Sequence, residues 1–472
     1  MTVLDAEKMI YTVDDIPKPF AKTVALALQH MLTMFGATVA VPLLLAATMD
    51  MDPYQTSVMV ACAMFASGFA TLLQVNFGTR LPIIQGVSFA FLGPFFGIIA
   101  AVAATGGDGP VTMTYINGAI ILGALVEAAI GFTGIIGRLQ RVVTPVVIGP
   151  VICLIGLALY STGAPWAGGN WPLAILVMAL TFIFSLILGP KKPFFALFPV
   201  LLAVVIGYLV AVFCSLTGIF GPENAGFVNF EAVRVADWIR WKVIFPWGVP
   251  KFSFTFFLVI LAGFLGSIIE SYGDYHAIAA AAGVGKPTPK MINRGIGFEG
   301  VACVLTGIFG GFASTSYTEN IGLIGLTKVA SRYVVSVAAV IFIILGVFGK
   351  FGGVVATIPE PIVGALYCTL FGLISAVGLS NTAKADMTSM RNMMIVGFCL
   401  FMGLSVPVYM ADAEIVIAGA PWVADIITTI GGTSMAVAAI LGLILDNIIP
   451  GTDEERGITS YISAGEEETV SG

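Results

Sequence analysis

Charged residues are scarce in this chain: only 10% of its 472 residues are Asp, Glu, Lys or Arg, and only two are His. The basic residues form no patch, which argues against a nucleic-acid partner. The six cysteines form no CxxC pair, so we expect neither a disulfide framework nor a zinc site, only small packing residues. Two histidines offer little for a metal cluster or a catalytic constellation. We therefore expect no enzyme and no cofactor.

Hydrophobic residues are abundant instead, at 58% of the chain, and the mean hydropathy is +1.01. A helix that crosses a bilayer needs about 20 mostly apolar residues, and apolar runs of that kind follow one another almost from end to end. The sequence predicts an all-α polytopic membrane protein. We find no continuous polar stripe along several helices, which a channel would need.

Fourteen apolar segments can be marked in the sequence: 20–46, 53–76, 83–104, 112–136, 141–162, 171–189, 194–215, 253–277, 291–309, 314–331, 333–349, 354–376, 392–409 and 429–447. Lys and Arg collect on the cytoplasmic side of short loops. With both ends of the chain inside, sixteen of the Lys and Arg residues fall on that side and five outside, four of these in the long loop 216–252. This separation supports fourteen spans with cytoplasmic N- and C-termini.

Fourteen spans divide into two sevens, and an odd repeat enters the membrane the second time with opposite orientation, as in the inverted repeats of secondary transporters. Spans 3 and 10 hold corresponding places in the two halves. Span 3 opens with Leu81-Pro-Ile-Ile-Gln-Gly-Val-Ser-Phe-Ala90 and span 10 with Gly311-Phe-Ala-Ser-Thr-Ser-Tyr-Thr-Glu-Asn320. Both openings are polar or β-prone, so we expect short strands and broken helices there. Paired breaks of this kind indicate a midplane binding site.

The break in span 10 contains a carboxylate, Glu319. Non-helical backbone at membrane depth survives only where it is buried in protein or lines a wet cavity. An ionisable group in such a break is a functional-site candidate. We therefore expect Glu319 to contact a substrate.

The other ionisable residues inside predicted spans are few. Glu270 and Asp274 are four residues apart, so they share one helix face and would tend to share a proton or a cation. The alternative is that Asp274 sits at the cytoplasmic helix end, hydrated or capping. His30 is either a proton relay or a satisfied buried imidazole. Glu127 lies among small residues that indicate tight helix packing with one interhelical hydrogen bond. Glu299 is a further candidate relay, and His276 is expected in a loop.

Four motifs occur in the order of the spans. They are Gln29-His30 followed by Phe35-Gly-Ala-Thr-Val-Ala-Val-Pro42, then Ser88-Phe-Ala-Phe91, Glu270-Ser-Tyr-Gly-Asp274, and Glu319-Asn-Ile-Gly-Leu-Ile-Gly-Leu-Thr-Lys328. The last fits the signature (Gln/Glu/Pro)-Asn-x-Gly-x(4)-Thr-(Arg/Lys/Gly) at each fixed position. With these motifs the chain resembles the nucleobase/ascorbate transporters, also called the xanthine/uracil permease family, over nearly its whole length.

The resemblance implies a core domain (spans 1–4 and 8–11) that moves against a gate domain (spans 5–7 and 12–14), often in dimers. It also implies a substrate between the strands of spans 3 and 10, held by Glu270, Glu319 and groups near Phe89 and Thr318, with Ser88 beside them. Gln29, Gln85 and Asn320 would support the site. The implied boundaries are 1–19 (N-terminal tail), 20–138 and 253–352 (core), 139–215 and 353–449 (gate), 216–252 (extracytoplasmic loop) and 450–472 (C-terminal tail).

The expected substrate follows from charge. A neutral uracil or xanthine ring alternates N–H donors and C=O acceptors, so carboxylates accept from it while free backbone N–H groups donate to it. Ascorbate is an anion, which two acids without a countercharge would repel. In the family the ascorbate branch carries Pro at the position of Glu319, and uracil-type members commonly carry Glu. We expect uracil first and xanthine or another purine base second.

The run from Glu270 to Lys328 is nevertheless close to the animal sodium-dependent branch, which includes nucleobase and ascorbate carriers. Proton symport is favoured because His30, Asp274 and Glu299 are titratable, and Na⁺ near Glu270 and Asp274 is the alternative. An anion exchanger of the same fold would need a basic residue where spans 3 and 10 cross, and the sequence has none there. The expected partners are the nucleobase, the lipid bilayer and a second copy in a homodimer. The short extracytoplasmic loops and the lack of a targeting signal predict a bacterial inner membrane or an equivalent plasma membrane.

Overall fold

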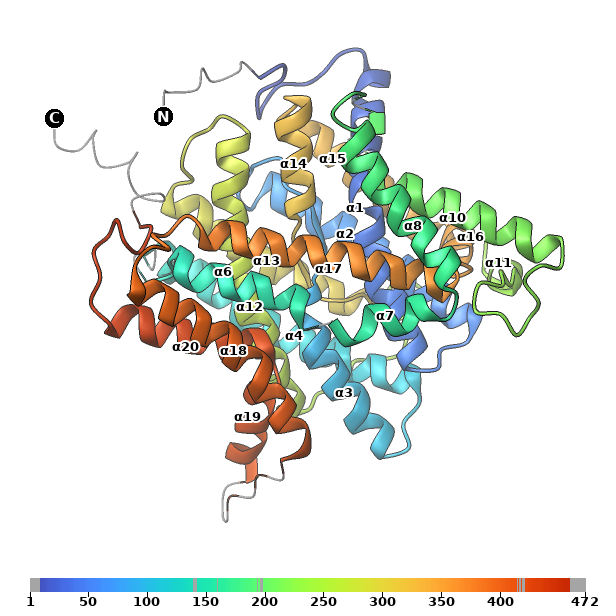
Figure 1. Ribbon diagram of the computed structural model, residues 1–472. Coiled ribbons are helices and arrows are strands. Elements are labelled where there is room, and N and C mark those ends of the chain that lie inside the picture. The colour runs from blue at the N-terminus through green and yellow to red at the C-terminus, as the bar shows by residue number, and fades with distance from the viewer. Residues whose placement is uncertain are drawn as a thin grey trace.

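The computed structural model describes residues 9–138, 142–158, 160–192, 194–195, 198–413, 415, 417 and 421–458. Helices dominate it (Figure 1). Every one of the fourteen predicted segments overlaps a helix. The elements are α1 (Phe20–Thr48), α2 (Pro53–Asn76), β1 (Gln85–Val87), η1 (Phe89–Phe91), α3 (Leu92–Ala104), α4 (Gly109–Thr133), α5 (Ile135–Arg138), α6 (Pro145–Leu157), α7 (Tyr160–Gly168), α8 (Trp171–Phe182), η3 (Ile183–Leu188), α10 (Pro199–Leu216), α11 (Glu231–Val235), α12 (Phe254–Ala281), α13 (Pro289–Ile308), β2 (Ser314–Ser316), α14 (Thr318–Thr327), α15 (Arg332–Val347), α16 (Gly349–Val355), α17 (Glu360–Thr382), α18 (Met390–Asp412), α19 (Pro421–Gly431) and α20 (Ser434–Ile448).

The number of spanning helices depends on how the broken segments are counted. Within the described residues, nine helices are long and apolar enough to cross a membrane, or up to ten if α15 and α16, which are bent by 86° to each other, count as one span. Two apolar helices, Phe89–Ala104 and Ser434–Ile448, are shorter. An all-α polytopic fold is therefore confirmed, whereas the count of fourteen stays a prediction.

The strands predicted at the start of spans 3 and 10 are present. β1 pairs with β2 in an antiparallel register in which Gln85 faces Ser316 and Val87 faces Ser314. Short helices follow directly, η1 and α3 after β1 and α14 after β2. The two breaks therefore meet each other, and one strand comes from each half of the chain.

The outer edges of this two-stranded sheet are covered by side chains of neighbouring helices. On β1, the backbone N–H of Gln85 donates to Oγ1 of Thr71 (3.0 Å) and its carbonyl accepts from the same hydroxyl (3.1 Å). On β2, the N–H of Ser316 donates to Oγ of Ser271 (3.4 Å), and that of Ser314 donates to Sγ of Cys303 (3.3 Å). These bonds satisfy backbone groups that water cannot reach inside a bilayer. Cys303 is thus more than the apolar packing residue that the sequence predicted.

The helices form two packed groups. In the first, α13 packs on α4, and α15 packs on α2 and α1. In the second, α17 packs on α6, α7 and α8, while α18 and α20 pack on each other and on α6. Figure 1 shows α17 beside α6 although the two are far apart in the sequence. The helix α12 contacts both α4 of the first group and α6 and α20 of the second.

The N-terminal segment is tied to the turn that joins α14 and α15. The N–H of Ile10 donates to the carbonyl of Lys328 (2.9 Å), and the N–H of Ala330 donates to that of Tyr11 (2.9 Å). Arg332 forms an ion pair with Asp14 at 2.6 Å. The described part of the predicted N-terminal tail is therefore an ordered strap on the first group of helices.

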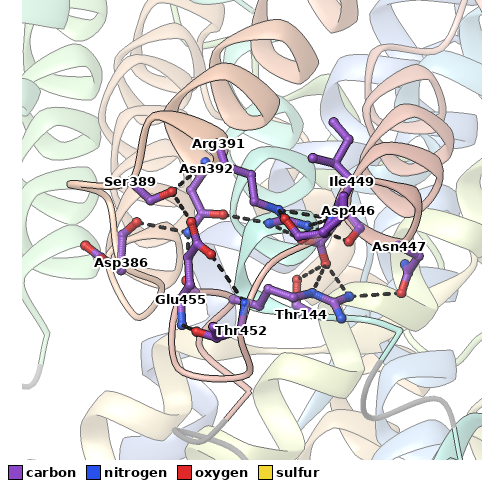
Figure 2. A network of polar contacts seen from close by, with 12 residues as sticks. Thr144, Asp386, Ser389, Arg391, Asn392, Asp446, Asn447, Ile449, Thr452 and Glu455 are labelled. Carbon is purple, nitrogen blue, oxygen red and sulfur yellow. Dashed lines mark hydrogen bonds and ion pairs between the residues drawn. The ribbon is translucent and has the colours of Figure 1, made fainter.

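A polar network holds the C-terminal segment 450–458 against α18 and α20 (Figure 2). At its centre, the fully buried carboxylate of Asp446 accepts from Arg391 (2.9 Å), Arg456 (2.8 Å) and Thr144 (2.9 Å). Both guanidinium groups are themselves mostly buried, with side chains 9% and 14% exposed. The network therefore joins the ends of three elements, α6, α18 and α20, to the last described residues.

Replacing Asp446 by Ala is expected to destabilise the protein by about 3–5 kcal/mol, because two buried cations would lose their shared partner. Aggregation of the detergent-solubilised protein on heating, followed by size-exclusion chromatography, measures this loss. The matched control is Glu231→Ala, which breaks a surface pair with Arg234 whose side chains are 80% and 47% exposed; it should change stability by no more than about 0.5 kcal/mol. Equal heat stability of both variants would contradict a structural role for the network.

Candidate substrate site

A cavity of about 460 Å³ lies where the two groups of helices meet. Its volume is in the range typical of small-molecule sites, roughly 300–1,000 Å³. One side of the cavity is formed by α1, η1, α12, β2 and α14 and is lined by Leu32, Thr33, Gly36, Ala37, Phe89, Glu270, Thr315, Ser316, Tyr317, Thr318, Glu319, Ile321, Gly322, Leu323 and Leu326. The other side is formed by α6, the start of α10 and α17 and is lined by Ile152, Phe198, Pro199, Val200, Leu201, Leu370, Leu373, Ile374 and Val377.

Two carboxylates face this mostly apolar cavity. Glu319 stands in the first turn of α14, and Glu270 stands on α12. The Oε2 atom of Glu270 is buried and has no hydrogen-bond partner among the described residues. A buried carboxylate oxygen without a donor is costly, so this atom is available to a ligand. The described lining includes no Lys, Arg or His, so no positive side chain offsets the two acids.

The other residues predicted to touch substrate divide into two sets. Phe89 and Thr318 line the cavity. The ring of Phe89 packs edge-on against Phe371 of α17, with centroids 5.2 Å apart, so it touches both groups of helices. Ser88 is fully buried outside this lining, and its hydroxyl accepts from the N–H of Ala90 at 3.2 Å. Ser88 is therefore a cap of the short helix η1, which it holds in position.

Asp274 lies directly behind the cavity wall. It is buried well inside α12, and its carboxylate accepts from Ser316 (2.7 Å) and from Thr318 (2.9 Å). Of the two alternatives that the sequence left open, hydration at a helix end is wrong. Asp274 fixes the junction of β2 and α14. His276, expected in a loop, also lies within α12 and is 8% exposed, because the helix continues to Ala281.

Glu299 has the densest set of hydrogen-bond donors near the site. It is fully buried on α13. Its carboxylate accepts from Gln85 of β1 (3.2 Å) and from three residues of α12: Tyr275 (2.6 Å), Ser271 (2.7 Å) and Ser267 (3.1 Å). Four donors stabilise the charged form. Glu299 thereby joins β1, α12 and α13 behind the strands.

His30 and Asn320 meet on the side of the cavity formed by α1. The amide of Asn320 donates to the carbonyl of His30 (3.0 Å) and lies 3.3 Å from its Nδ1. Both residues are almost fully buried. Gln29 is half-buried, and its carbonyl accepts from Thr33 at 2.9 Å. The contact between His30 and Asn320 therefore anchors the start of α14 to α1.

Three residues of this region were missed in the sequence. Ser271 bonds both Glu299 and the backbone of β2, and Tyr275 bonds Glu299. Tyr317 lines the cavity and donates its hydroxyl to the carbonyl of Val87 at 2.9 Å, across the two strands. Ser271 lies inside the motif Glu270-Ser-Tyr-Gly-Asp274, and its place one residue after a cavity carboxylate was the available signal.

Comparison with known sequences decides the family. The sequence model of the permease family matches residues 21–411. The chain belongs to this xanthine/uracil permease family, the nucleobase/ascorbate transporters. Human solute carrier family 23 member 2 is 38% identical over 96% of this chain and 76% of its own length. Nucleobase-ascorbate transporter 1 of Arabidopsis thaliana is 33% identical over 96% of this chain and 92% of its own length.

Two of the solved structures that share this fold are other transporters. The transmembrane domain of the cyanobacterium bicarbonate transporter BicA superposes with a TM-score of 0.58 at 14% identity, covering 89% of this chain and 99% of that one. SLC26A9 gives a TM-score of 0.54 at 11% identity, covering 91% and 66%. The nucleobase/ascorbate transporter therefore has the inverted-repeat fold expected from its sequence. It is a multi-pass membrane transporter and not an enzyme.

Proposed function

We propose that this transporter imports a neutral nucleobase, uracil first and xanthine or another purine base second, by proton symport. The observation that carries the proposal is that Glu270 and Glu319 line the same cavity and that its described lining contains no basic residue. The Oε2 atom of Glu270 lacks a donor among the described residues, and such a carboxylate oxygen is suited to accept from a ring N–H group. A transporter for an anion would be built with the opposite charge.

The start of α14 supplies the complementary donors. Its N-cap residue, Tyr317, makes no side-chain cap bond, so the first-turn N–H groups stay free of the usual side-chain acceptor. Such groups point along the helix axis and bind electronegative atoms. In our proposal, ring carbonyl oxygens accept from this turn while Glu319 and Glu270 accept from ring N–H groups.

Two helix groups line the cavity, which supports movement of a core domain against a gate domain. We propose the boundaries 20–138 and 253–352 for the core and 139–215 and 353–449 for the gate. The core would carry both carboxylates, and the gate would contribute mainly apolar contacts from α10 and α17. We propose a homodimer, in which contacts between the gate domains would hold them still while the core domains move. The protein would lie in the plasma membrane or the bacterial inner membrane, with both termini in the cytoplasm.

A second candidate function is sodium-coupled transport of a nucleobase or of ascorbate. The similarity to an animal solute carrier, at 38% identity, favours it, and Glu270 and Asp274 stand on one face of α12 with oxygen atoms suited to Na⁺. Anion exchange is the most distant alternative. The bicarbonate transporter shares only the fold.

A single uptake panel tests these candidates. Purified transporter in liposomes is given labelled uracil, xanthine, adenine or ascorbate, with an inward proton gradient or an inward sodium gradient. We expect uracil to be taken up fastest, xanthine next, and uptake to collapse when a protonophore is added. Replacing sodium by choline should change nothing. Faster uptake of ascorbate than of either base, or a requirement for sodium, would favour the second candidate.

A further inference from the structure

Glu127 is a buried carboxylic acid that the substrate cavity does not use. It stands in the middle of α4 and is 1% exposed. Neither of its carboxylate oxygens has a hydrogen-bond partner among the described residues. The interhelical hydrogen bond expected from the sequence is therefore wrong. An ionised carboxylate in such a place would cost several kcal/mol, so Glu127 is stable only as a neutral acid or with a bound cation.

The packing of α4 on α13 puts Glu127 beside Glu299. A Cβ added to Gly300 would lie 2.4 Å from the backbone N of Ala128, and one added to Gly131 would lie 2.2 Å from that of Gly297. The two backbones are therefore in direct contact on either side of this point, and Gly300 and Ala128 directly follow Glu299 and Glu127. This close packing of the two backbones brings the carboxylates near enough for like charges to repel each other.

The two acids have opposite surroundings. Glu299 accepts from four donors, whereas Glu127 has none. Hydrogen bonds to a carboxylate favour its charged form, and two close carboxylates in a medium of low dielectric favour one shared proton. Gln85, fully buried, donates to Glu299 through Nε2 and leaves its Oε1 without a partner among the described residues. The Oε1 atom of Gln85 is therefore an unused hydrogen-bond acceptor next to Glu299. The tight backbone contact favours a proton over a larger cation.

A hydrogen-bonded route joins this pair to the cavity. Ser271 Oγ lies 2.7 Å from Glu299 Oε1 and 3.1 Å from Ser316 Oγ. Ser316 donates to Asp274, which also accepts from Thr318. Ser316 and Thr318 line the cavity. A shift of Ser316 on substrate binding would therefore reach Glu299 through Ser271.

Among the described residues, the titratable side chains that face the pair are acids, a phenol and a thiol, and none is basic. Tyr275 faces it from α12 and Cys303 from α13. Glu270 and Asp274, also on α12, add negative charge on the cavity side. None of these groups supplies a positive charge.

We propose that Glu127 and Glu299 share one exchangeable proton and form a second titratable site for coupling, behind the substrate strands. Resting on the proposed proton symport, this inference names the group that holds the proton. The pair has a net charge of −1 when protonated and −2 when the proton has left. A substrate that reorders Ser316 weakens the donors of Glu299 and so favours the protonated pair.

The decisive variant is Glu127→Gln, which keeps the shape of the neutral acid and removes the proton. The control is Leu125→Ala on the same helix, since Leu125 is 54% exposed on the other side of α4. With a proton gradient, we expect Glu127→Gln to bind uracil and exchange it across the membrane but to lose gradient-driven accumulation. The unmodified protein and the control should show rates that change by up to about tenfold per pH unit on one limb of the profile, as one proton predicts. Accumulation and a pH profile unchanged by Glu127→Gln would overturn the proposal.

Infrared spectroscopy supplies a test that needs no transport. The unmodified protein should show a protonated carboxylic acid band that shifts in heavy water. The difference between the spectra of Glu127→Gln in ordinary and in heavy water should lack this band. If uptake proves to be sodium-driven while this band is present, the proton symport fails and the shared proton stands. Absence of the band from the unmodified protein would refute the shared proton itself. Should Glu127→Gln fold poorly, Glu127→Asp keeps the carboxyl group, and its pH profile should shift instead of vanishing.

Discussion

Replacing Glu319 by Ala is expected to abolish nucleobase binding while the protein stays folded in the membrane. Glu319 faces the cavity from the first turn of α14, and the change removes the acceptor for a ring N–H group. Replacing it by Gln keeps a carbonyl acceptor and the shape but loses the charge. Binding should then weaken by roughly 1–3 kcal/mol, which is roughly 5–150-fold in Kd. Titration of the purified protein with labelled uracil measures both changes.

The matched control is Glu360→Gln, because Glu360 is also in the first turn of a helix but is exposed at the start of α17. It should bind as the unmodified protein does. Glu319→Pro should lose nucleobases completely, and we expect no gain of ascorbate, since Glu270 still faces the cavity. Near-normal uracil affinity of Glu319→Ala would remove Glu319 from the substrate site.

Replacing Gly86 by Ala is expected to weaken substrate binding by a similar amount through sterics alone. A Cβ at position 86 would lie 2.5 Å from Cζ of the Tyr317 ring. That ring lines the cavity, and its hydroxyl is bonded to the carbonyl of Val87. The ring must move into the cavity wall or lose its bond. Overpacking of this kind costs roughly 1–3 kcal/mol, and a Kd measured for uracil should rise accordingly.

Gly93→Ala is the control for this change, in the helix α3 that follows β1. A Cβ there would meet only the methyl group of Thr433, at 3.8 Å, which is ordinary contact. Its affinity and heat stability should equal those of the unmodified protein. If Gly86→Ala also binds normally, the ring of Tyr317 adapts freely and the cavity wall is less rigid than its hydrogen bonds indicate.

The strand pair could be predicted from the sequence because its physical cause is local. Polar, β-prone residues interrupt apolar runs at 81–90 and 311–320, and a bilayer tolerates such breaks only where they are covered. The presence of Glu270 and Glu319 in one cavity was implied by the resemblance to the nucleobase/ascorbate transporters, and the lining of the cavity includes both. Their role in binding remains a prediction.

The second layer behind the cavity could not be predicted, because it depends on how distant helices face each other. Ser271 and Gln85 meet Glu299 only through the packing of α12, β1 and α13. The isolation of Glu127 likewise depends on glycine contacts between α4 and α13. Single-sequence patterns report the periodicity of one helix and say nothing of its partner. The number of spans stayed open for a related reason, since bent and broken helices have no fixed length.

Because β1 pairs with β2, the substrate site cannot form until the second half of the chain has been synthesised. The first half of the chain enters the membrane carrying a strand whose hydrogen-bonding partner has not yet been made. That strand keeps open N–H and C=O groups until residues 314–316 arrive from the ribosome. Neither half therefore contains a finished substrate site, because the site needs β2 to pair with β1 and α17 to add its side of the cavity. A ribosome that stalls before β2 leaves a membrane protein with an exposed sheet edge, which is a natural signal for quality control.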